Sequence, residues 1–224
     1  MAKGNSGLDT LVPSGYGADS DGPWTQNPDM SEPDTLKTAL GEKGRPLGIE
    51  RAAKGANPYY SYDYREFSEN CQRAVIAYEA RRRGYNVTAR PTFEGDVLPR
   101  HAHTNADGSV NAHWMGAFQN AKSIHVGAKD AQTVRDKIES NMKSFGNGSR
   151  AVIQVQWVGG GGHVFNIERR YGRTYWVDAQ VGMRYNPNDV LRVVKTDKVN
   201  LVRTDNLRFS ERAKKSVEPA GRRH

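Results

Sequence analysis

Residues 70–84 of the chain read NCQRAVIAYEARRRG, and this stretch has the clearest structural pattern in the sequence. From Cys71 onward its apolar residues recur every three or four positions, which is the spacing of one helical face. Asn70 is a favourable residue at a helix start, and Gly84 is a favourable residue just past a helix end. The stretch therefore predicts a helix over residues 71–83.

The sequence after this helix contains several apolar runs that are typical of strands and are separated by turn residues, as in an antiparallel sheet. Strands are expected at residues 86–90, 150–158, 163–169, 173–180 and 199–203, and helices at residues 130–145 and 187–193. One cysteine-bearing helix followed by an antiparallel sheet predicts an α+β domain over residues 58–210.

The two ends of the chain have a different composition. Residues 1–57 are rich in Gly, Pro, Asp, Ser and Asn, and they predict a disordered or extended arm because such a segment buries too little apolar area to offset its ordering entropy. A short helix around 35–40 is the one regular element expected there. Residues 211–224 predict a basic, solvated tail. Deletion of residues 1–50 is accordingly expected to leave the midpoint of thermal unfolding nearly unchanged.

The composition excludes several classes of protein. The 224 residues contain a single cysteine, Cys71, which excludes an intramolecular disulfide framework and a multi-cysteine zinc module. No apolar run reaches the ~18–20 residues of a transmembrane helix, and the first residues lack the apolar stretch of a signal peptide. Histidines 101, 103 and 113 have no acidic or thiol ligand at a convincing spacing, so neither a metal nor a cofactor is expected.

The net charge of +8 is unevenly distributed. Residues 1–70 carry 7 Lys and Arg against 11 Asp and Glu, a net charge of −4, whereas residues 71–224 carry 26 against 14, a net charge of +12. A basic domain indicates an acidic partner such as nucleic acid, or it serves solubility alone. No nucleic-acid-binding motif accompanies these charges, so contact with nucleic acid would be nonspecific.

Cys71 occupies the first turn of its helix, where the helix dipole and the free backbone N–H groups stabilise a negative charge. A thiolate at such a position is a nucleophile. A buried structural cysteine is the alternative interpretation, since free cysteines are often buried. A catalytic role needs a histidine and a group that orients it.

A hairpin later in the chain offers both groups. With its turn at residues 171–172, His163 lies opposite Gln180 and Phe165 lies opposite Asp178. Cross-strand partners share a face of the sheet, so these four side chains are expected on one side. Asp178 is then a diagonal neighbour of the histidine, close enough to hold its ring in one tautomer.

The stretch from Asn70 to Val87 resembles the cysteine segment of the papain-fold toxin family of glutamine deamidases. The segments GHVFN at 162–166 and WVDAQ at 176–180 resemble the histidine and aspartate segments of that family, in the same order. The resemblance extends over roughly residues 57–210. Ala179 stands where the aspartate segment of the family has proline.

The resemblance implies a papain-like cysteine-hydrolase fold, with the cysteine helix packed on an antiparallel sheet that carries His163 and Asp178. It implies that the Cys71 thiolate attacks the side-chain carboxamide of a protein glutamine, while His163 transfers protons and Asp178 orients the imidazole. The Cys71 N–H binds the developing oxyanion, with Asn70 or Gln180 as a side-chain donor beside it.

Members of this family occur as toxin modules and in bacteriophage head-associated proteins. The partner expected from the resemblance is a host or competitor protein that carries the target glutamine. Further expected partners are a cognate inhibitor or phage head proteins, and the expected location is the cytoplasm of a target cell or the virion. The alternatives are a cysteine peptidase or transglutaminase on the same fold, and a non-catalytic phage structural or DNA-associated protein.

Overall fold

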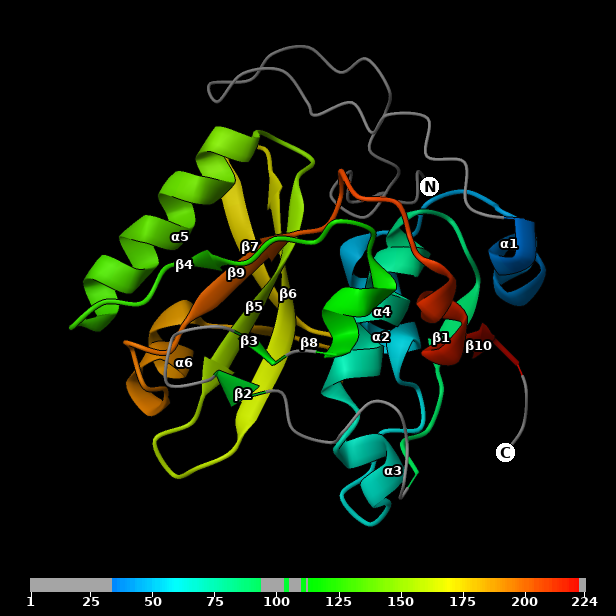
Figure 1. Ribbon diagram of the computed structural model, residues 1–224, viewed down its shortest axis with the longest axis horizontal. Helices are drawn as coiled ribbons and strands as arrows, with labels where there is room; N and C mark the ends of the chain where they lie inside the picture. Colours follow the sequence, from blue (N-terminus) through cyan, green and yellow to red (C-terminus); the bar gives the residue numbers. More distant parts are fainter. Residues whose placement is uncertain (1–33, 94–102, 105–109, 112, 222–224) are drawn as a thin grey trace, which may run out of the picture.

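The computed structural model describes residues 34–93, 103–104, 110–111 and 113–221, and Figure 1 labels its elements. The helices are α1 Asp34–Leu40, α2 Ile49–Ala56, α3 Arg65–Ser68, α4 Cys71–Arg82, α5 Ala131–Phe145 and α6 Pro187–Val193, with 3-10 helices η1 His113–Ala117 and η2 Glu211–Lys215. The strands are β1 Val87–Ala89, β2 His103–Thr104, β3 Val110–Asn111, β4 Ile124–His125, β5 Arg150–Gln156, β6 Gly162–Arg170, β7 Arg173–Asp178, β8 Met183–Tyr185, β9 Asn200–Arg203 and β10 Val217–Pro219. In this part of the chain, every helix is too short or too polar to cross a membrane.

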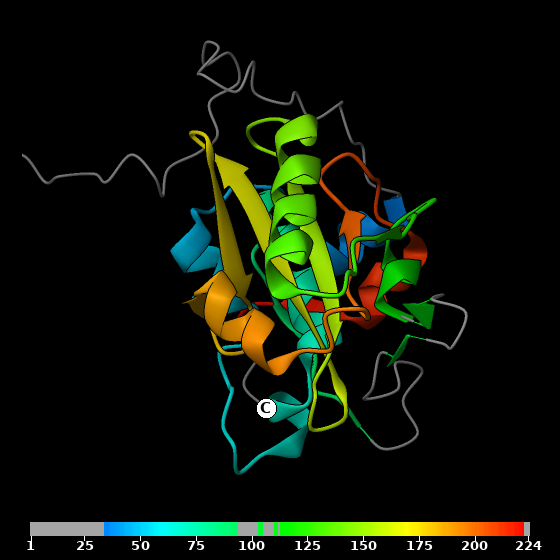
Figure 2. The ribbon, with the colours of Figure 1, turned by 90° about the vertical axis from the view of Figure 1, so that its left-hand side faces the viewer.

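Six of the strands form one antiparallel sheet in the order β4-β9-β5-β6-β7-β8. Figure 1 shows α5 and α6 on one side of this sheet and α4 and α2 on the other, and Figure 2 shows α5 running along the sheet face. β1 and β10 pair in a separate two-stranded ribbon beside α4. The arrangement confirms the α+β class and the antiparallel sheet predicted from the sequence.

Side chains alternate between the two faces of each strand, so the sheet contributes to two hydrophobic cores. In β6, Val164 belongs to the core on the α4 side, and its neighbour Phe165 belongs to the core on the α5 side. In β7, Val177 and Trp176 divide in the same way. The apolar stripe of α5 covers the second core with Val134, Ile138 and Met142.

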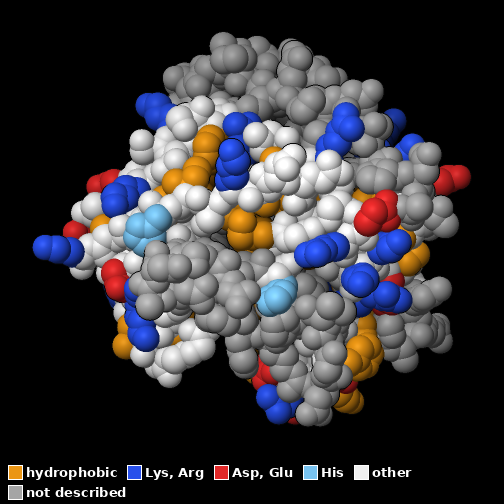
Figure 3. Space-filling view, viewed as in Figure 1, with side chains coloured by type: hydrophobic (Ala, Val, Ile, Leu, Met, Phe, Trp, Pro, Cys, Tyr) orange, Lys and Arg blue, Asp and Glu red, His pale blue; other side chains and the backbone are white. Residues whose placement is uncertain are grey.

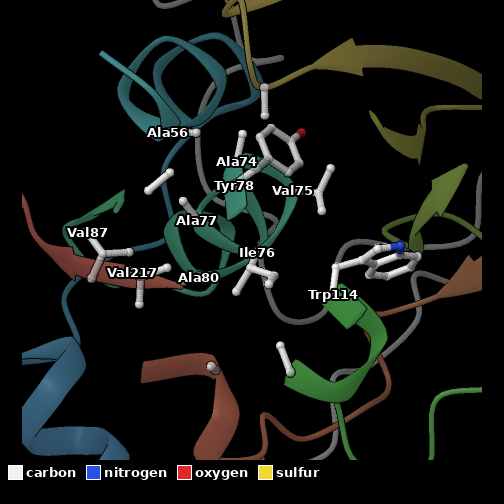
Figure 4. Packing of buried hydrophobic residues seen from close by; sticks show 14 of the residues in the cluster. Ala56, Ala74, Val75, Ile76, Ala77, Tyr78, Ala80, Val87, Trp114 and Val217 are labelled. Atoms are coloured by element: carbon white, nitrogen blue, oxygen red, sulfur yellow. The ribbon is translucent and has the colours of Figure 1, made fainter. Parts of the chain in front are cut away.

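The first core is built around α4, whose residues are all buried. Figure 4 shows the alanines of this helix close to Ala56 of α2, with Val87 of β1 and Val217 of β10 next to each other at its side. Small residues allow α2 to approach closely. A Cβ atom placed on Gly55 would lie only 2.1 Å from the Arg81 guanidinium, so a larger residue there would displace that side chain.

Because α4 is buried on all sides, its charged residues need partners inside the protein. The Glu79 carboxylate accepts hydrogen bonds from Arg83 Nε at 2.8 Å and from Arg150 Nε and Nη2 at 2.8 and 2.9 Å. The Glu168 carboxylate on β6 accepts a hydrogen bond from Arg82 Nε at 2.7 Å. We call these five residues the buried ion network. Burial raises the pKa of Glu79, but the two guanidinium groups outweigh burial and lower it to about 2.

Several elements predicted from the sequence are confirmed. The cysteine helix is α4, and the helices expected at residues 130–145 and 187–193 are α5 and α6. The register predicted for the β6–β7 hairpin is also confirmed, because Arg170 pairs with Arg173 across the turn. These are the segments in which apolar residues recur with a clear helical or strand period.

The prediction of a disordered or extended arm over residues 1–57 is wrong for residues 34–57. The short helix expected around residues 35–40 is confirmed as α1. Residues 34–57 form α1 and α2, and they bury Leu36, Leu40 and Ile49 in the first core. The error has a physical reason: both helices are short, and most of the apolar surface of α2 comes from alanines, which give little hydropathy signal but pack closely against α4. The remainder of that prediction, residues 1–33, lies outside the described residues.

The prediction of a solvated basic tail over residues 211–224 is wrong for residues 211–221. Residues Glu211–Lys215 form η2, which buries Ala213, and β10 pairs with β1 and buries Val217. The basic residues of this segment suggested full solvation, but single apolar side chains between them suffice to attach it to the core. Residues 222–224 lie outside the described part of the chain.

On the face shown in Figure 3, Lys and Arg occur at several separate places among the described residues, some of them beside Asp or Glu. This distribution is the one expected of charges that serve solubility.

The structure reverses the expectation for deletion of residues 1–50. The deletion removes α1 and the start of α2, and with them three buried side chains, Leu36, Leu40 and Ile49, each worth about 1.5–3 kcal/mol. We expect stability to fall by roughly 5 kcal/mol, and the unfolding midpoint by about 10–20 °C. Circular dichroism recorded during heating measures the unfolding midpoint of the truncated protein. The control is Lys37→Ala in the full chain, which changes an exposed side chain of α1. An unchanged midpoint would show that α1 contributes nothing to the core.

The buried ion network predicts a large cost for removing one carboxylate charge. Glu79→Gln leaves the guanidinium groups of Arg83 and Arg150 buried without their counter-charge, so we expect a loss of about 3–5 kcal/mol in the free energy of unfolding. The matched control is Asp189→Asn, which breaks an exposed pair with Arg192 and should cost below about 1 kcal/mol. Urea titrations of both variants measure the difference, and equal costs would contradict the prediction.

Candidate active site

The structure brings together the three residues that the sequence singled out as a nucleophile, a base and an orienting carboxylate. Cys71 is the first residue of α4, His163 is the second residue of β6, and Asp178 is the last residue of β7. All three side chains are buried, with 6%, 7% and 1% of their residue surface exposed. They thus meet where the start of the helix reaches the ends of two neighbouring strands.

His163 is held between the other two residues. Its Nε2 atom lies 2.8 Å from Asp178 Oδ2, and the ring also forms a hydrogen bond with the Cys71 side chain. Because Nε2 faces the carboxylate, Nδ1 is the ring nitrogen left for the thiol. The neutral ring therefore carries its proton on Nε2, and Nδ1 can accept one.

The charges at the site favour the protonated form of His163. Burial disfavours the imidazolium, but the charge and the hydrogen bond of Asp178, followed by the interaction with Cys71, outweigh burial and raise the pKa of His163 to about 10. Burial likewise opposes ionisation of Asp178, but His163, the Tyr185 hydroxyl and the Gln180 N–H lower the pKa of that carboxyl below its ordinary value. An imidazolium–carboxylate pair therefore exists at neutral pH.

Aromatic rings surround the imidazole. The Trp157 ring stacks on His163 at a centroid distance of 5.6 Å and an interplanar angle of 23°. Phe165 and Tyr185 lie at 6.0 and 6.5 Å from the imidazole centroid. These rings restrict the orientation of the imidazole and exclude water from one side of it, which strengthens its interaction with Asp178.

Asn70 and Gln180, the candidate oxyanion donors, differ in how their amides are used. Asn70 Nδ2 donates to Asn57 Oδ1 at 3.3 Å and to Arg90 O at 2.9 Å, so both of its N–H groups have acceptors within the protein. Gln180 Nε2 donates one hydrogen bond, to Ser68 O at 2.9 Å, and its second N–H has no acceptor in the described part of the chain. Of the two side chains, Gln180 is therefore the one whose amide has an N–H group available to a substrate.

The backbone N–H of Cys71 is a further donor. It belongs to the first turn of α4, where N–H groups have no partner inside the helix. Within residues 34–93 and 113–221 it donates to no acceptor. An anion that forms on a substrate bound at the Cys71 sulfur would meet this group at the positive end of the helix dipole.

Two residues at the site were missed from the sequence. The Tyr185 hydroxyl donates to Asp178 Oδ2, and the Asn57 amide donates to Phe67 O at 2.9 Å and to Gln180 O at 3.0 Å. A signal for Tyr185 existed, since a tight turn after Asp178 places it opposite Trp176, which is its partner in the sheet. Asn57 carried no such signal because its partners come from distant segments.

The glycine run after β5 lies beside the Trp157–His163 pair. Gly160 and Gly161 have φ angles of +99° and +75°, a backbone conformation that favours glycine. In the described residues, no group of three or more His, Cys, Asp or Glu side chains is arranged to hold a metal ion. Of the three histidines considered for a metal, His113 is exposed and His101 lies outside the described residues.

Residues 69–183 match the family described as papain fold toxin 1, glutamine deamidase. No curated protein and no solved structure is significantly similar to the chain. The matched segment begins two residues before Cys71 and contains both His163 and Asp178. Since the match covers more than half of the sequence, the chain belongs to the papain fold toxin 1, glutamine deamidase family.

Proposed function

We propose that this protein is a cysteine-dependent protein-glutamine deamidase, which converts a glutamine side chain of a target protein to glutamate. The observation that carries the proposal is the hydrogen-bonded row of Cys71, His163 and Asp178 at the start of α4. A thiol, a base and a carboxylate in this order form the arrangement that activates a cysteine nucleophile. Family membership selects a side-chain carboxamide as the group attacked.

In the first half of the proposed reaction, His163 has taken the thiol proton before substrate binds, which makes it the imidazolium described above, and the Cys71 thiolate attacks the carboxamide carbon. The resulting tetrahedral intermediate carries a negative charge on its oxygen. When it collapses, the C–N bond breaks, His163 gives its proton to the departing nitrogen, and ammonia leaves. Asp178 stabilises the imidazolium that exists between these two proton transfers.

The second half of the reaction releases the product. Water attacks the thioester carbon, and His163, which is now neutral, removes a proton from that water. The C–S bond breaks, the Cys71 thiol is regenerated, and the substrate carries a glutamate carboxylate. The net reaction consumes one water molecule and yields one ammonia, and it needs no cofactor.

The oxyanion of each half-reaction needs donors that are in place before substrate arrives. We assign the Cys71 backbone N–H and the second N–H of the Gln180 amide to this role. Asn70 acts instead as a positioning residue, because its amide joins Asn57 to Arg90 O and its Oδ1 accepts from the Thr92 hydroxyl at 2.8 Å. It fixes the segment that immediately precedes the nucleophile.

The biological setting that we propose follows from the family. A toxin or effector of this kind acts in the cytoplasm of a target cell, on a host or competitor protein that carries the modified glutamine. A cognate inhibitor in the producing cell and an association with phage heads are parts of the same proposal. The net charge of +8 also allows nonspecific contact with nucleic acid.

Mass spectrometry tests the reaction directly. A host lysate incubated with wild-type protein should contain a protein in which one glutamine has become glutamate, a gain of about 1 Da per site that follows from exchanging NH₂ for OH. Cys71→Ala should reduce the conversion by at least ~10³-fold while the protein stays folded. Chain cleavage in place of the mass gain would identify a peptidase, and amine incorporation a transglutaminase. A Cys71→Ala variant with wild-type turnover would refute the mechanism.

The raised pKa of His163 predicts how activity depends on pH. The imidazolium is the acid that protonates the leaving nitrogen, so deamidation should fall as pH rises through about 10, and not through the ordinary value of a histidine. Asp178→Asn removes the charge that raises this pKa, so the fall should move to lower pH. The rate measured against pH for both proteins tests this. A decline near pH 6.5 in the wild-type protein would contradict the charge assignment.

A further inference from the structure

We propose that Tyr185 is a positioning residue of this active site, whose hydroxyl holds the Asp178 carboxylate in the orientation that His163 requires. The catalytic consequence rests on the proposed deamidase function, whereas the effect on His163 itself does not. Tyr185 lies in β8, the edge strand of the sheet, outside the segment that matches the family.

The sheet register places Tyr185 on the correct face. Tyr185 is the cross-strand partner of Trp176, and Met183 is the partner of Asp178. Residues two apart on a strand share a face, so Trp176, Asp178 and Tyr185 all project to the same side. Tyr185 is therefore the diagonal neighbour of Asp178, and its long side chain reaches the carboxylate.

The hydrogen bonds account for both carboxylate oxygens of Asp178. Oδ1 accepts the backbone N–H of Gln180 at 2.8 Å. Oδ2 accepts the Tyr185 hydroxyl and also faces His163 Nε2 at 2.8 Å. The oxygen that orients the imidazole is thus the same oxygen that the tyrosine holds. Without the hydroxyl, rotation of the carboxylate is limited by one backbone bond and by His163 itself.

The phenol is itself fixed and remains a donor. Its ring meets the Phe165 ring edge-on, at a centroid distance of 5.6 Å and an interplanar angle of 79°. Burial, together with the negative charge of Asp178, raises the pKa of Tyr185 above its ordinary value, so the hydroxyl keeps its proton. The other titratable groups that act on this hydroxyl are Tyr60, from the loop between α2 and α3, and Cys71.

Sharing one oxygen between two donors has an electrostatic consequence. The Tyr185 hydroxyl partly neutralises Oδ2 and so weakens the attraction between Asp178 and the imidazolium. Loss of the hydroxyl should therefore raise the pKa of His163 further, while it also allows the carboxylate to turn. A residue that served only to fill space would not change the titration of His163.

The test compares Tyr185→Phe with Tyr175→Phe in the full chain. The first variant keeps the ring and removes the hydroxyl, so the fold is expected to persist. The control makes the same change on β7, where Tyr175 packs against the α4-side core and stacks with Arg184. The first readout is the titration of His163 by NMR of histidine-labelled protein. The second is the rate of Cys71 alkylation by iodoacetamide against pH, which needs no substrate, and the third is the rate of deamidation.

For Tyr185→Phe we expect the His163 titration to move upward by at least ~0.5 pH unit, with a parallel shift in the alkylation profile. Deamidation should fall about 10- to 100-fold, and Tyr175→Phe should change none of the three readouts. An unchanged His163 titration in Tyr185→Phe would overturn the proposal. If the titration shifts as expected but the wild-type protein deamidates nothing, the role of Tyr185 at His163 stands and the proposed deamidase function fails.

Discussion

The geometry of the site depends on the hydrogen-bonded ion pairs that join α4 to the sheet. Cys71 and Glu79 lie on the same helix, and His163 and Glu168 lie on the same strand. The helix–strand pair that brings the thiol to the imidazole at one end is thus joined at the other end by Arg82 and Glu168. Buried ion pairs add little net stability compared with apolar packing, but they tolerate few alternative arrangements. We infer that the buried ion network fixes the position of α4 along β6, and thereby the approach of the sulfur to the imidazole.

The same low-polarity interior determines the protonation of the His163–Asp178 pair. Burial on its own would make His163 neutral and Asp178 protonated, a state with no carboxylate to stabilise an imidazolium. Each instead keeps the other charged, and the carboxylate is further stabilised by the Gln180 N–H and the Tyr185 hydroxyl. The aromatic rings around the imidazole strengthen this mutual effect because they keep water away from it. The charged forms of His163 and Asp178 therefore stabilise each other although both side chains are buried.

The parts of the fold that could be predicted from the sequence are those with strong local periodicity. The helix that begins at Cys71 and the register that sets His163 near Asp178 both follow from patterns contained within about fifteen residues. The helix α2 was missed because alanines carry much of its packing, and Tyr185 was missed because its strand has only three residues. Asn70 illustrates a different limit of prediction from the sequence. Its position beside Cys71 suggested an oxyanion donor, but the partners of its amide come from other segments of the chain, and no local pattern reveals them.

Gln180 shows why the site is organised before any substrate binds. Its backbone N–H holds Asp178, its side chain donates to Ser68 O just before the cysteine helix, and its carbonyl accepts from Asn57. One residue thus couples the orientation of the carboxylate to the position of the segment that leads into Cys71. A displacement of either part strains bonds in the other, so the thiol, the base and the proposed oxyanion donor are held as one unit. Catalysis by preformed dipoles requires such rigidity, because groups already in place need no reorganisation as charge develops on the substrate.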